Sequence, residues 1–385
     1  MRMLVAGGGT GGHVFPGVAL AEEVVGRHFA NDVVFVGTAR GLEARVVPEA
    51  GFPIDLIDVK GLKGKGLVGI LLSVLLLPRA FLDSFRILRR WRPDVVVGVG
   101  GYASGPVVLA AWLLRIPTSV QEQNAVPGLT NRILGRFVKA VFTAFPEAAA
   151  HFPRRKVFQL GNPIRRTLME NFMRPDTPHE LPRVLVFGGS QGAHALNMRV
   201  IEALPHLADL RQAIRFTHQT GARDREQVER GYAACGFEPD VREFIDDMSA
   251  AYAECDVVVC RAGATTLAEL MVCKRPSILI PFPAAADNHQ VVNARSLADA
   301  GAAVMIEERD LTGELLAREI RSLLGSRERR ERMARAAGRL GSPQAASEIA
   351  DVCTQLVAGR WGSNAGQARP PGHVPVRPAG AGGSP

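Results

Sequence analysis

Two glycine-rich turns, each directly after a short apolar strand, are the residues of this sequence best suited to bind phosphate. They are residues 7–12 (GGGTGG) and residues 188–193 (GGSQGA). Apolar residues at helical spacing follow each turn, so both turns fall at a helix N-terminus. Backbone N–H groups and the helix dipole attract an anion there, and glycine lets a phosphate approach closely. The pair predicts two separate phosphate-binding halves.

A third glycine cluster, residues 98–106 (GVGGYASGP), also follows a strand in the first half. Two helix N-termini at one sheet edge suit a ligand that carries a diphosphate. The candidates for that contact are Gly9, Gly101, Tyr102 and Ser104. The alternative is that these glycines only allow a strand and a helix to pack closely.

In the second half, residues 260–269 (CRAGATTLAE) follow an apolar strand and place Glu269 about one turn into a helix. A carboxylate at that depth can accept hydrogen bonds from both hydroxyls of a ribose, or it can simply complement the helix dipole. Residues 287–290 (DNHQ) form a polar loop that suits a sugar or a solvated turn. His13, which follows the first glycine turn, is a candidate general base or a structural histidine.

Short apolar runs alternate with helical or loop segments along the chain, which predicts parallel sheets with helices on both faces, an α/β fold of two doubly wound Rossmann-like domains. The strands expected in the first half are residues 3–6, 33–36, 53–59, 94–99, 118–121, 140–143 and 157–160. Those expected in the second half are residues 184–187, 214–217, 241–244, 257–260, 277–280 and 303–306. The predicted domains are residues 1–162 and 163–340, with a helix at 341–358 that crosses back to the first domain and a tail at 359–385 without packed structure.

Composition narrows the class of protein. The 385 residues suit two domains, and five cysteines without metal-binding spacing suit a reducing compartment. The N-terminus lacks the pattern of a signal peptide, and the longest apolar stretch, residues 66–77, is shorter than the ~20 residues of a membrane-spanning helix. We therefore expect a cytoplasmic protein.

The net charge of +8 is concentrated in residues 60–92, where basic side chains flank the most apolar segment. This combination predicts contact with an anionic membrane surface; the alternative is a buried helix with solvated arginines beyond it. The segment lacks interleaved aromatic residues and any nucleic-acid-binding module, so we expect no nucleic acid partner.

Residues 7–12 also fit the fingerprint of a dinucleotide-binding oxidoreductase. That fingerprint needs an acidic residue after the second strand to hold the ribose. Here the strand 33–36 is followed by Gly37-Thr38-Ala39-Arg40, which weakens this interpretation.

Seven motifs together resemble the MurG family, the bacterial N-acetylglucosaminyltransferases that convert lipid I to lipid II in peptidoglycan synthesis. They are GGTGGHVFPG (8–17), GGYASGP (100–106), EQNAVPGLTNR (122–132), GNPIR (161–165), GGSQGA (188–193), RAGATTLAEL (261–270) and DNHQ (287–290). The resemblance implies a glycosyltransferase-B fold whose two domains face a cleft, with UDP-N-acetylglucosamine bound to the second domain and lipid I to the first. It further implies a peripheral protein on the cytoplasmic face of the inner membrane, with partners among the cell-wall synthesis and division proteins.

The resemblance also implies which residues bind the donor. They are Thr10, Gly11, Gly12, Asn124, Arg165, Ser190, Ile245, Ala264, Thr265, Thr266, Leu267, Ala268, Glu269 and Gln290. Of these, Ile245 would present its backbone to uracil, Glu269 would hold the ribose, and Asn124 and Gln290 would contact the sugar.

The implied reaction is an inverting displacement by the acceptor 4-hydroxyl. His13 is the expected base, because the unperturbed pKa of histidine, about 6.5, suits proton transfer at neutral pH. Helix N-termini and Arg165 would stabilise the departing UDP, so no metal or cofactor is expected to be required and a divalent cation would at most stimulate.

Many members of the MurG family have histidine before Glu-Gln-Asn, whereas this chain has Gln121, which cannot titrate. This excludes a base at position 121 and leaves a carboxylate or a water relay as the alternative to His13. The rival functions are a UDP-sugar 2-epimerase, a related transferase with another acceptor, lipid or aglycone, and a non-catalytic nucleotide-sugar-binding protein.

Overall fold

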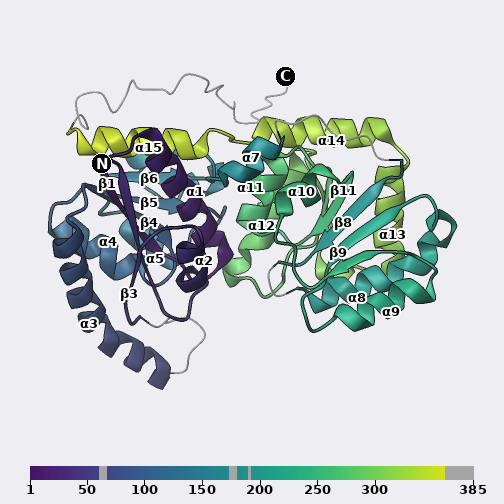
Figure 1. Ribbon diagram of the computed structural model, residues 1–385, viewed down its shortest axis with the longest axis horizontal. Helices are drawn as coiled ribbons and strands as arrows, with labels where there is room; N and C mark the ends of the chain where they lie inside the picture. Colours follow the sequence, from purple (N-terminus) through teal and green to yellow (C-terminus); the bar gives the residue numbers. More distant parts are fainter. Residues whose placement is uncertain (60–66, 173–179, 190–191, 360–385) are drawn as a thin grey trace, which may run out of the picture.

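The computed structural model describes residues 1–59, 67–172, 180–189 and 192–359, which form two lobes side by side (Figure 1). Each lobe contains one sheet, and every strand pair is parallel. The first sheet has seven strands in the order β3-β2-β1-β4-β5-β6-β7, and the second has six in the order β10-β9-β8-β11-β12-β13. The predicted pair of doubly wound α/β sheets is confirmed.

The strands of the first sheet are β1 Arg2–Gly7, β2 Asp32–Gly37, β3 Ile54–Leu56, β4 Val95–Gly100, β5 Thr118–Glu122, β6 Ala140–Thr143 and β7 Val157–Gln159. Those of the second are β8 Arg183–Phe187, β9 Arg215–Gln219, β10 Asp240–Arg242, β11 Val257–Cys260, β12 Ser277–Leu279 and β13 Val304–Met305. All thirteen lie at the predicted positions, but β3 and β13 are shorter than expected. Both are edge strands, so hydrogen bonds to one neighbour alone set their length.

Helices connect the strands and cover both faces of each sheet. In the first lobe they are α1 Gly11–Arg27, α2 Glu43–Glu49, α3 Leu67–Trp91, α4 Ser104–Leu113, α5 Leu129–Leu134 and α6 Pro146–Ala149. Then come α7 Arg166–Phe172, α8 His194–Ala203, α9 Arg225–Ala234, α10 Met248–Ala253, α11 Ala264–Val272, α12 His289–Asp299, α13 Gly313–Leu324, α14 Arg327–Leu340 and α15 Ala345–Val357.

Alternation along β1 explains why this sheet needs helices on both sides. Met3 and Val5 pack with α1 and α15, whereas Leu4 and Ala6 pack on the opposite face with α3 and α4. Successive side chains of a strand point to opposite faces, so an uninterrupted apolar strand is buried only in a three-layer arrangement.

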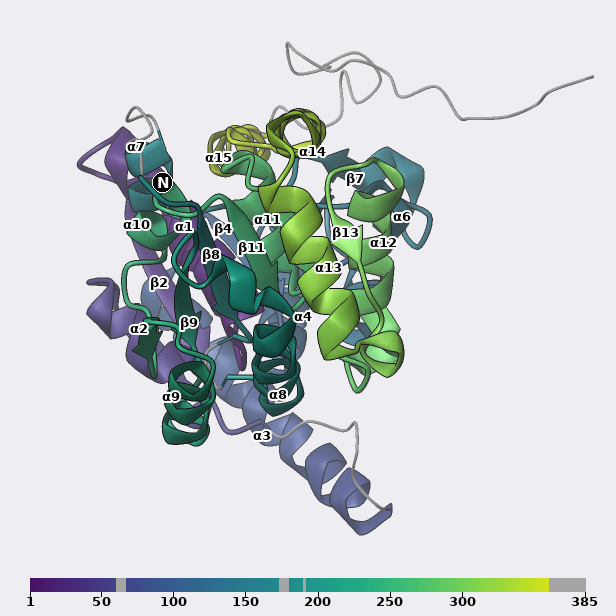
Figure 2. The ribbon, with the colours of Figure 1, turned by 90° about the vertical axis from the view of Figure 1, so that its right-hand side faces the viewer.

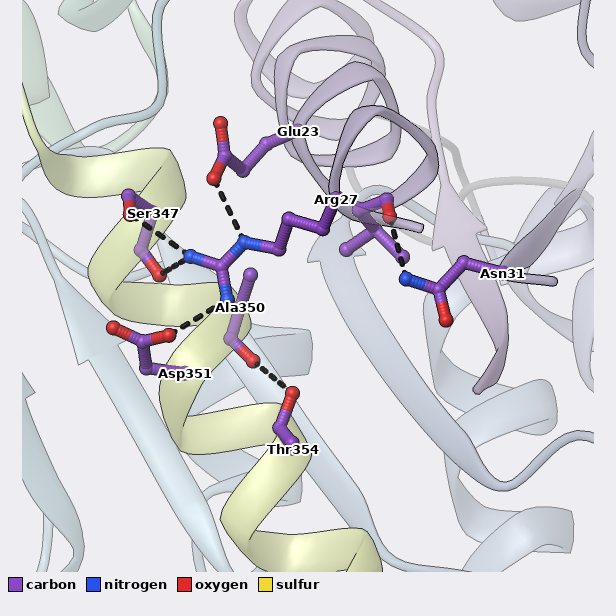
Figure 3. Close-up of polar contacts among 8 residues, drawn as sticks. Glu23, Arg27, Asn31, Ser347, Ala350, Asp351 and Thr354 are labelled. Carbon is purple, nitrogen blue, oxygen red and sulfur yellow. Dashed lines mark hydrogen bonds and ion pairs between the residues drawn. The ribbon is translucent and has the colours of Figure 1, made fainter. Parts of the chain in front are cut away.

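The last helix, α15, returns to the first lobe: along the top edge of Figure 1, α14 lies over the second lobe and α15 over the first, and Figure 2 shows both helices at the same edge of the molecule. Its Ile349 and Cys353 are fully buried against the first sheet. Arg27, at the end of α1, fixes it further by donating to the Asp351 carboxylate at 2.6 Å and to the carbonyl and hydroxyl of Ser347 at 2.7 and 2.8 Å (Figure 3). The two lobes are thus connected twice by the chain, first at residues 161–163 and again through residues 341–358.

Within the described ranges, no helix combines the length and the apolar character needed to cross a bilayer. Residues 60–66 of the predicted basic segment and residues 360–385 of the predicted tail lie outside the described residues.

Candidate active site

The glycine turns lie where the strand order of each sheet reverses direction. In the first sheet this point is between β1 and β4, which lead into residues 8–10 and 101–103. In the second sheet it is between β8 and β11, which lead into residues 188–193 and 261–263. Ligands of open α/β sheets bind beyond the carboxyl ends of the strands at such a point. The topology therefore places the predicted motifs at the binding edge of each sheet.

Close backbone packing accounts for part of the first-half glycine pattern. The Gly8 N–H donates to the Gly100 carbonyl at 3.2 Å, and a Cβ added at Gly7 or at Gly101 would lie 2.2 Å from the carbonyl oxygen opposite it. Gly9 differs, because a Cβ there would meet nothing within 4 Å. Close packing therefore explains Gly7 and Gly101 but not Gly9, and diphosphate binding at these glycines stays a prediction.

The candidates for the acceptor diphosphate differ in how open they are. Tyr102 is half exposed, whereas the Ser104 hydroxyl is fully buried, lies 2.5 Å from where a Gly98 Cβ would be, and has no hydrogen-bond partner among the described residues. The N–H of Gly9 already donates to the carboxylate of Glu43 at 2.6 Å. In this conformation Ser104 as a whole is buried, so its predicted contact with a diphosphate would require the loop to move.

His13 lies in the first turn of α1, with its ring against Gly100, where an added Cβ would be 2.8 Å from Nδ1. The Nδ1 atom is buried and has no hydrogen-bond partner among the described residues. Burial lowers the pKa of His13; the Gln123 side chain and the Val99 backbone oppose this shift, and the nearby His289 adds to it. The imidazole is therefore neutral at neutral pH and able to accept a proton.

In the second lobe, Ala264, Thr265 and Thr266 form the first turn of α11, where backbone N–H groups face outward from a helix N-terminus. Leu267 is different, because its side chain is fully buried and its N–H donates to the Gly263 carbonyl. Ala268, one residue further on, is also buried.

Glu269 points inward from α11. Its carboxylate accepts a hydrogen bond from the Tyr252 hydroxyl at 3.0 Å. Burial raises the pKa of Glu269, and the charge of Arg165 opposes that rise.

Gln219 connects the second glycine turn to the segment predicted to bind uracil. Its amide nitrogen donates to the Gly189 carbonyl at 2.8 Å, and its amide oxygen accepts from the Ile245 N–H at 2.9 Å. In this conformation only the carbonyl of Ile245 is left for a base. Ser190 lies outside the described residues.

The two lobes meet at several of the predicted residues. The Asn293 side chain donates to the Asn124 side chain at 3.2 Å and accepts from the Ala125 N–H at 2.8 Å. The Thr265 hydroxyl donates to the Gly12 carbonyl at 3.4 Å. Residues that are 169 and 253 positions apart in the sequence are thereby neighbours.

Arg165 and Gln290 complete this region. The Arg165 guanidinium lies 4.8 Å from the ring centre of Phe15, and its Nε is buried with no partner among the described residues. The Gln290 amide oxygen accepts from the N–H groups of Ala262 and Phe282, so its NH₂ group is the part left for a sugar hydroxyl.

Sequence reasoning passed over three polar residues that shape this region: Glu43, Gln219 and Glu122. Glu122 is buried and accepts from the N–H groups of Asn124 and Gly128 at 3.0 and 3.1 Å. Most of their partners are backbone groups of neighbouring loops, which leave no spacing signal in the sequence. Among the described residues, no three His, Cys, Asp or Glu side chains gather in a way that could hold a metal ion.

Comparison with known proteins agrees with this topology. The Glycosyltransferase family 28 N-terminal domain matches residues 3–143, and the Glycosyltransferase family 28 C-terminal domain matches residues 183–351. The chain belongs to glycosyltransferase family 28. The family 28 chain is thus a glycosyltransferase, with one family domain on each sheet.

Two relatives align with this family 28 chain over nearly its whole length. A protein of Anaeromyxobacter dehalogenans named UDP-N-acetylglucosamine--N-acetylmuramyl-(pentapeptide) pyrophosphoryl-undecaprenol N-acetylglucosamine transferase is 82% identical over 98% of the chain and 99% of its own length. The crystal structure of MurG from Acinetobacter baumannii is 32% identical, with a TM-score of 0.75 over 92% of this chain and 99% of that one. The expected MurG resemblance and fold are confirmed.

A UDP-GlcNAc 2-epimerase from Neisseria meningitidis, solved with UDP-GlcNAc bound, has a TM-score of 0.68 but only 13% identity. This likeness shows a shared fold alone. The epimerase alternative is not favoured.

Proposed function

We propose that this family 28 enzyme transfers N-acetylglucosamine from UDP-N-acetylglucosamine to the 4-hydroxyl of undecaprenyl-pyrophosphoryl-N-acetylmuramyl pentapeptide, lipid I, to give lipid II. The observation that carries this proposal is the 82% identity, over 98% of the chain, to a protein named for that transfer. The cytoplasmic face of the inner membrane is the proposed location, because there a nucleotide sugar and a lipid carrier can meet.

In the proposed reaction the acceptor 4-hydroxyl oxygen attacks the anomeric carbon of the donor. A new carbon–oxygen bond forms with inversion, the bond to the β-phosphate oxygen breaks, and UDP leaves with the electron pair. The neutral imidazole of His13 takes the hydroxyl proton. Its lowered pKa and its place at the seam between the lobes support this role.

The second lobe is the proposed site of UDP. The N–H groups at the start of α11 and the guanidinium of Arg165 would stabilise the charge of the departing diphosphate. Glu269 would exchange its bond to Tyr252 for the ribose hydroxyls. This arrangement requires no metal, so we expect activity to persist after chelation and at most to rise with added divalent cation.

Transfer of label from radioactive UDP-N-acetylglucosamine to a short-chain lipid I analogue tests the proposal. We expect label in the lipid fraction and a loss on the order of 100-fold or more in His13→Ala. A wild-type protein that binds UDP but transfers nothing would contradict the function, and an active His13→Ala would remove the base.

A membrane-facing surface on the first lobe is the proposed route of the lipid acceptor. Here the aromatic rings of Trp112 on α4 and Phe137 after α5 are in contact, with centroids 5.1 Å apart. Helix α4 contacts α3 and α5. The exposed apolar residues of these three elements and their ends include Leu82, Leu113, Leu129 and Ile133, and the exposed basic ones include Arg79, Arg86, Arg115, Arg132, Arg136 and Lys139.

Helix α4 connects this surface to the site. It begins at Ser104 beside the glycine turns and ends at Leu113, a length of ~15 Å. An apolar face with a basic rim suits the headgroup region of anionic lipid. A diphosphate at one end of α4 could thus stay attached to a lipid at the other.

Flotation with phosphatidylglycerol vesicles tests the surface. We expect the double variant Trp112→Ser, Phe137→Ser to bind vesicles at least about 10-fold more weakly. The control is Phe29→Ser, because Phe29 is 94% exposed but follows α1, which packs on the opposite face of the sheet. Equal loss in both variants, or loss in neither, would contradict the proposed surface.

A further inference from the structure

Glu43 is a buried carboxylate at the start of α2 that the reaction scheme does not use. It is 1% exposed. One carboxylate oxygen accepts from the Gly9 N–H at 2.6 Å, and the other accepts from the Thr38 N–H and hydroxyl, both at 2.9 Å. A carboxylate removed from water needs such donors. Glu43 therefore joins the loop after β1 to the loop after β2.

Three glycines make room for this side chain. A Cβ added at Gly8, Gly37 or Gly41 would lie 2.2, 2.4 or 2.0 Å from the nearest Glu43 atom. Gly8 belongs to the first glycine turn, and the other two flank Thr38. These glycines of both loops therefore leave the space that the Glu43 side chain occupies.

The loop held by Glu43 is also the one that faces the second lobe. No atom lies within 4 Å of the position that a Cβ of Gly9 would occupy. The hydrogen bond from the Gly9 N–H to the Glu43 carboxylate is therefore a contact that restrains this glycine, whose backbone is otherwise free to adopt many conformations. A few residues further on, the Gly12 carbonyl accepts from Thr265 of α11. His13 follows directly.

We propose that Glu43 is a positioning residue for the transfer reaction: its carboxylate holds the turn at residues 7–12 so that Gly12 and His13 meet the donor helix α11 in the geometry of reaction. This inference rests on the proposed function, because it assigns Glu43 an effect on that reaction. In the proposed site UDP lies mainly against the second lobe, and Thr10, Gly11 and Gly12 reach the donor only from across the seam between the lobes. We therefore expect Glu43 to affect kcat much more than it affects UDP affinity.

Two Glu43 variants and one neighbour separate positioning from other roles. Glu43→Gln keeps the shape but must turn an NH₂ group toward one of its donors, and Glu43→Asp keeps the charge but is one methylene too short to reach both loops. Thr38→Val removes one hydrogen bond to the same carboxylate and leaves the Gly9 bond in place. It is therefore the matched control.

We expect kcat to fall on the order of 10- to 100-fold in both Glu43 variants, because a displacement near 1 Å of a reacting group has effects of that size. The UDP affinity measured by calorimetry should change less than about 2-fold, and Thr38→Val should keep kcat within about 2-fold. Thermal melting of each variant checks that the rate is measured on folded protein.

The outcomes separate the two proposals. If the wild type transfers N-acetylglucosamine and both Glu43 variants keep its kcat, Glu43 is not a positioning residue. If Glu43→Asp is active and Glu43→Gln is inactive, the reaction depends on the negative charge at residue 43 and not on a side chain long enough to bond to both loops. That result also overturns the inference. A wild type without transfer activity contradicts the proposed function instead.

Discussion

At the residue scale, His13 shows how burial converts an ordinary histidine into a candidate base. The sequence alone shows that His13 follows the glycine turn, but its neutral state follows from its burial, with the ring against Gly100. Leu267 and Ser104 illustrate the reverse case, because the motif names them while their side chains are fully buried. A motif identifies a segment, and the backbone decides which of its atoms face outward.

The lowered pKa of His13 predicts the pH dependence of the reaction. A base must be unprotonated, so kcat/KM should fall on the acid side only below pH 6.5, the ordinary histidine value. Initial rates from pH 5 to 8 measure this limb. A limb centred above pH 6.5 would show that another group is the base or that His13 is exposed during turnover.

At the scale of elements, His218 ties three segments of the second lobe together. It lies fully buried on β9, and its ring nitrogens contact the Tyr232 hydroxyl of α9 at 3.2 Å and the Asn197 side chain of α8 at 3.1 Å. Asn197 in turn donates to Asp224 at 2.8 Å. This network fixes the helix that follows the second glycine turn.

Burial lowers the pKa of His218 to about 3, which predicts acid destabilisation. Between pH 6.5 and 3 the unfolded chain binds a proton there that the folded chain does not, so the free energy of unfolding decreases as pH falls. The slope from this residue is about 1.4 kcal/mol per pH unit.

Urea unfolding at pH 7 and pH 5 measures this effect. Because the unfolded histidine is only partly protonated near pH 6.5, His218 should contribute about 2 kcal/mol over this interval, and His218→Gln should remove that contribution. His13 also has a lowered pKa, so a smaller slope of the same sign should persist in the variant. An unchanged slope in His218→Gln would contradict the assignment.

At the scale of the whole molecule, the chain leaves the second lobe after α14, and the next helix, α15, packs on the first lobe. Its buried residues extend the core that surrounds β1, and Arg27 adds polar contacts at the surface of that core (Figure 3). The chain therefore passes between the lobes at two places, residues 161–163 and the segment before α15, and the lobes also meet through the hydrogen bonds of Asn293 and Thr265 described above.

Removal of the Arg27 contacts tests this attachment. We expect Arg27→Ala to lower the thermal midpoint by about 2–4 °C, since partly exposed pairs contribute up to about 1 kcal/mol. Arg45→Ala is the control, because Arg45 is 4.0 Å from Glu49 and both side chains are largely exposed. Equal midpoints for the two variants would show that apolar packing alone holds α15.

The sequence by itself determined the α/β class, all thirteen strands, the glycine turns and the family, because these depend on local patterns of apolar and glycine residues. Only the tertiary structure decided which polar groups are already occupied. Glu43 and Gln219 bond to backbone groups 34 and 26 residues away, and Asn293 to a side chain 169 residues away. Their partners are set by how strands are ordered and how lobes meet, and buried polar groups must find partners wherever the fold brings them.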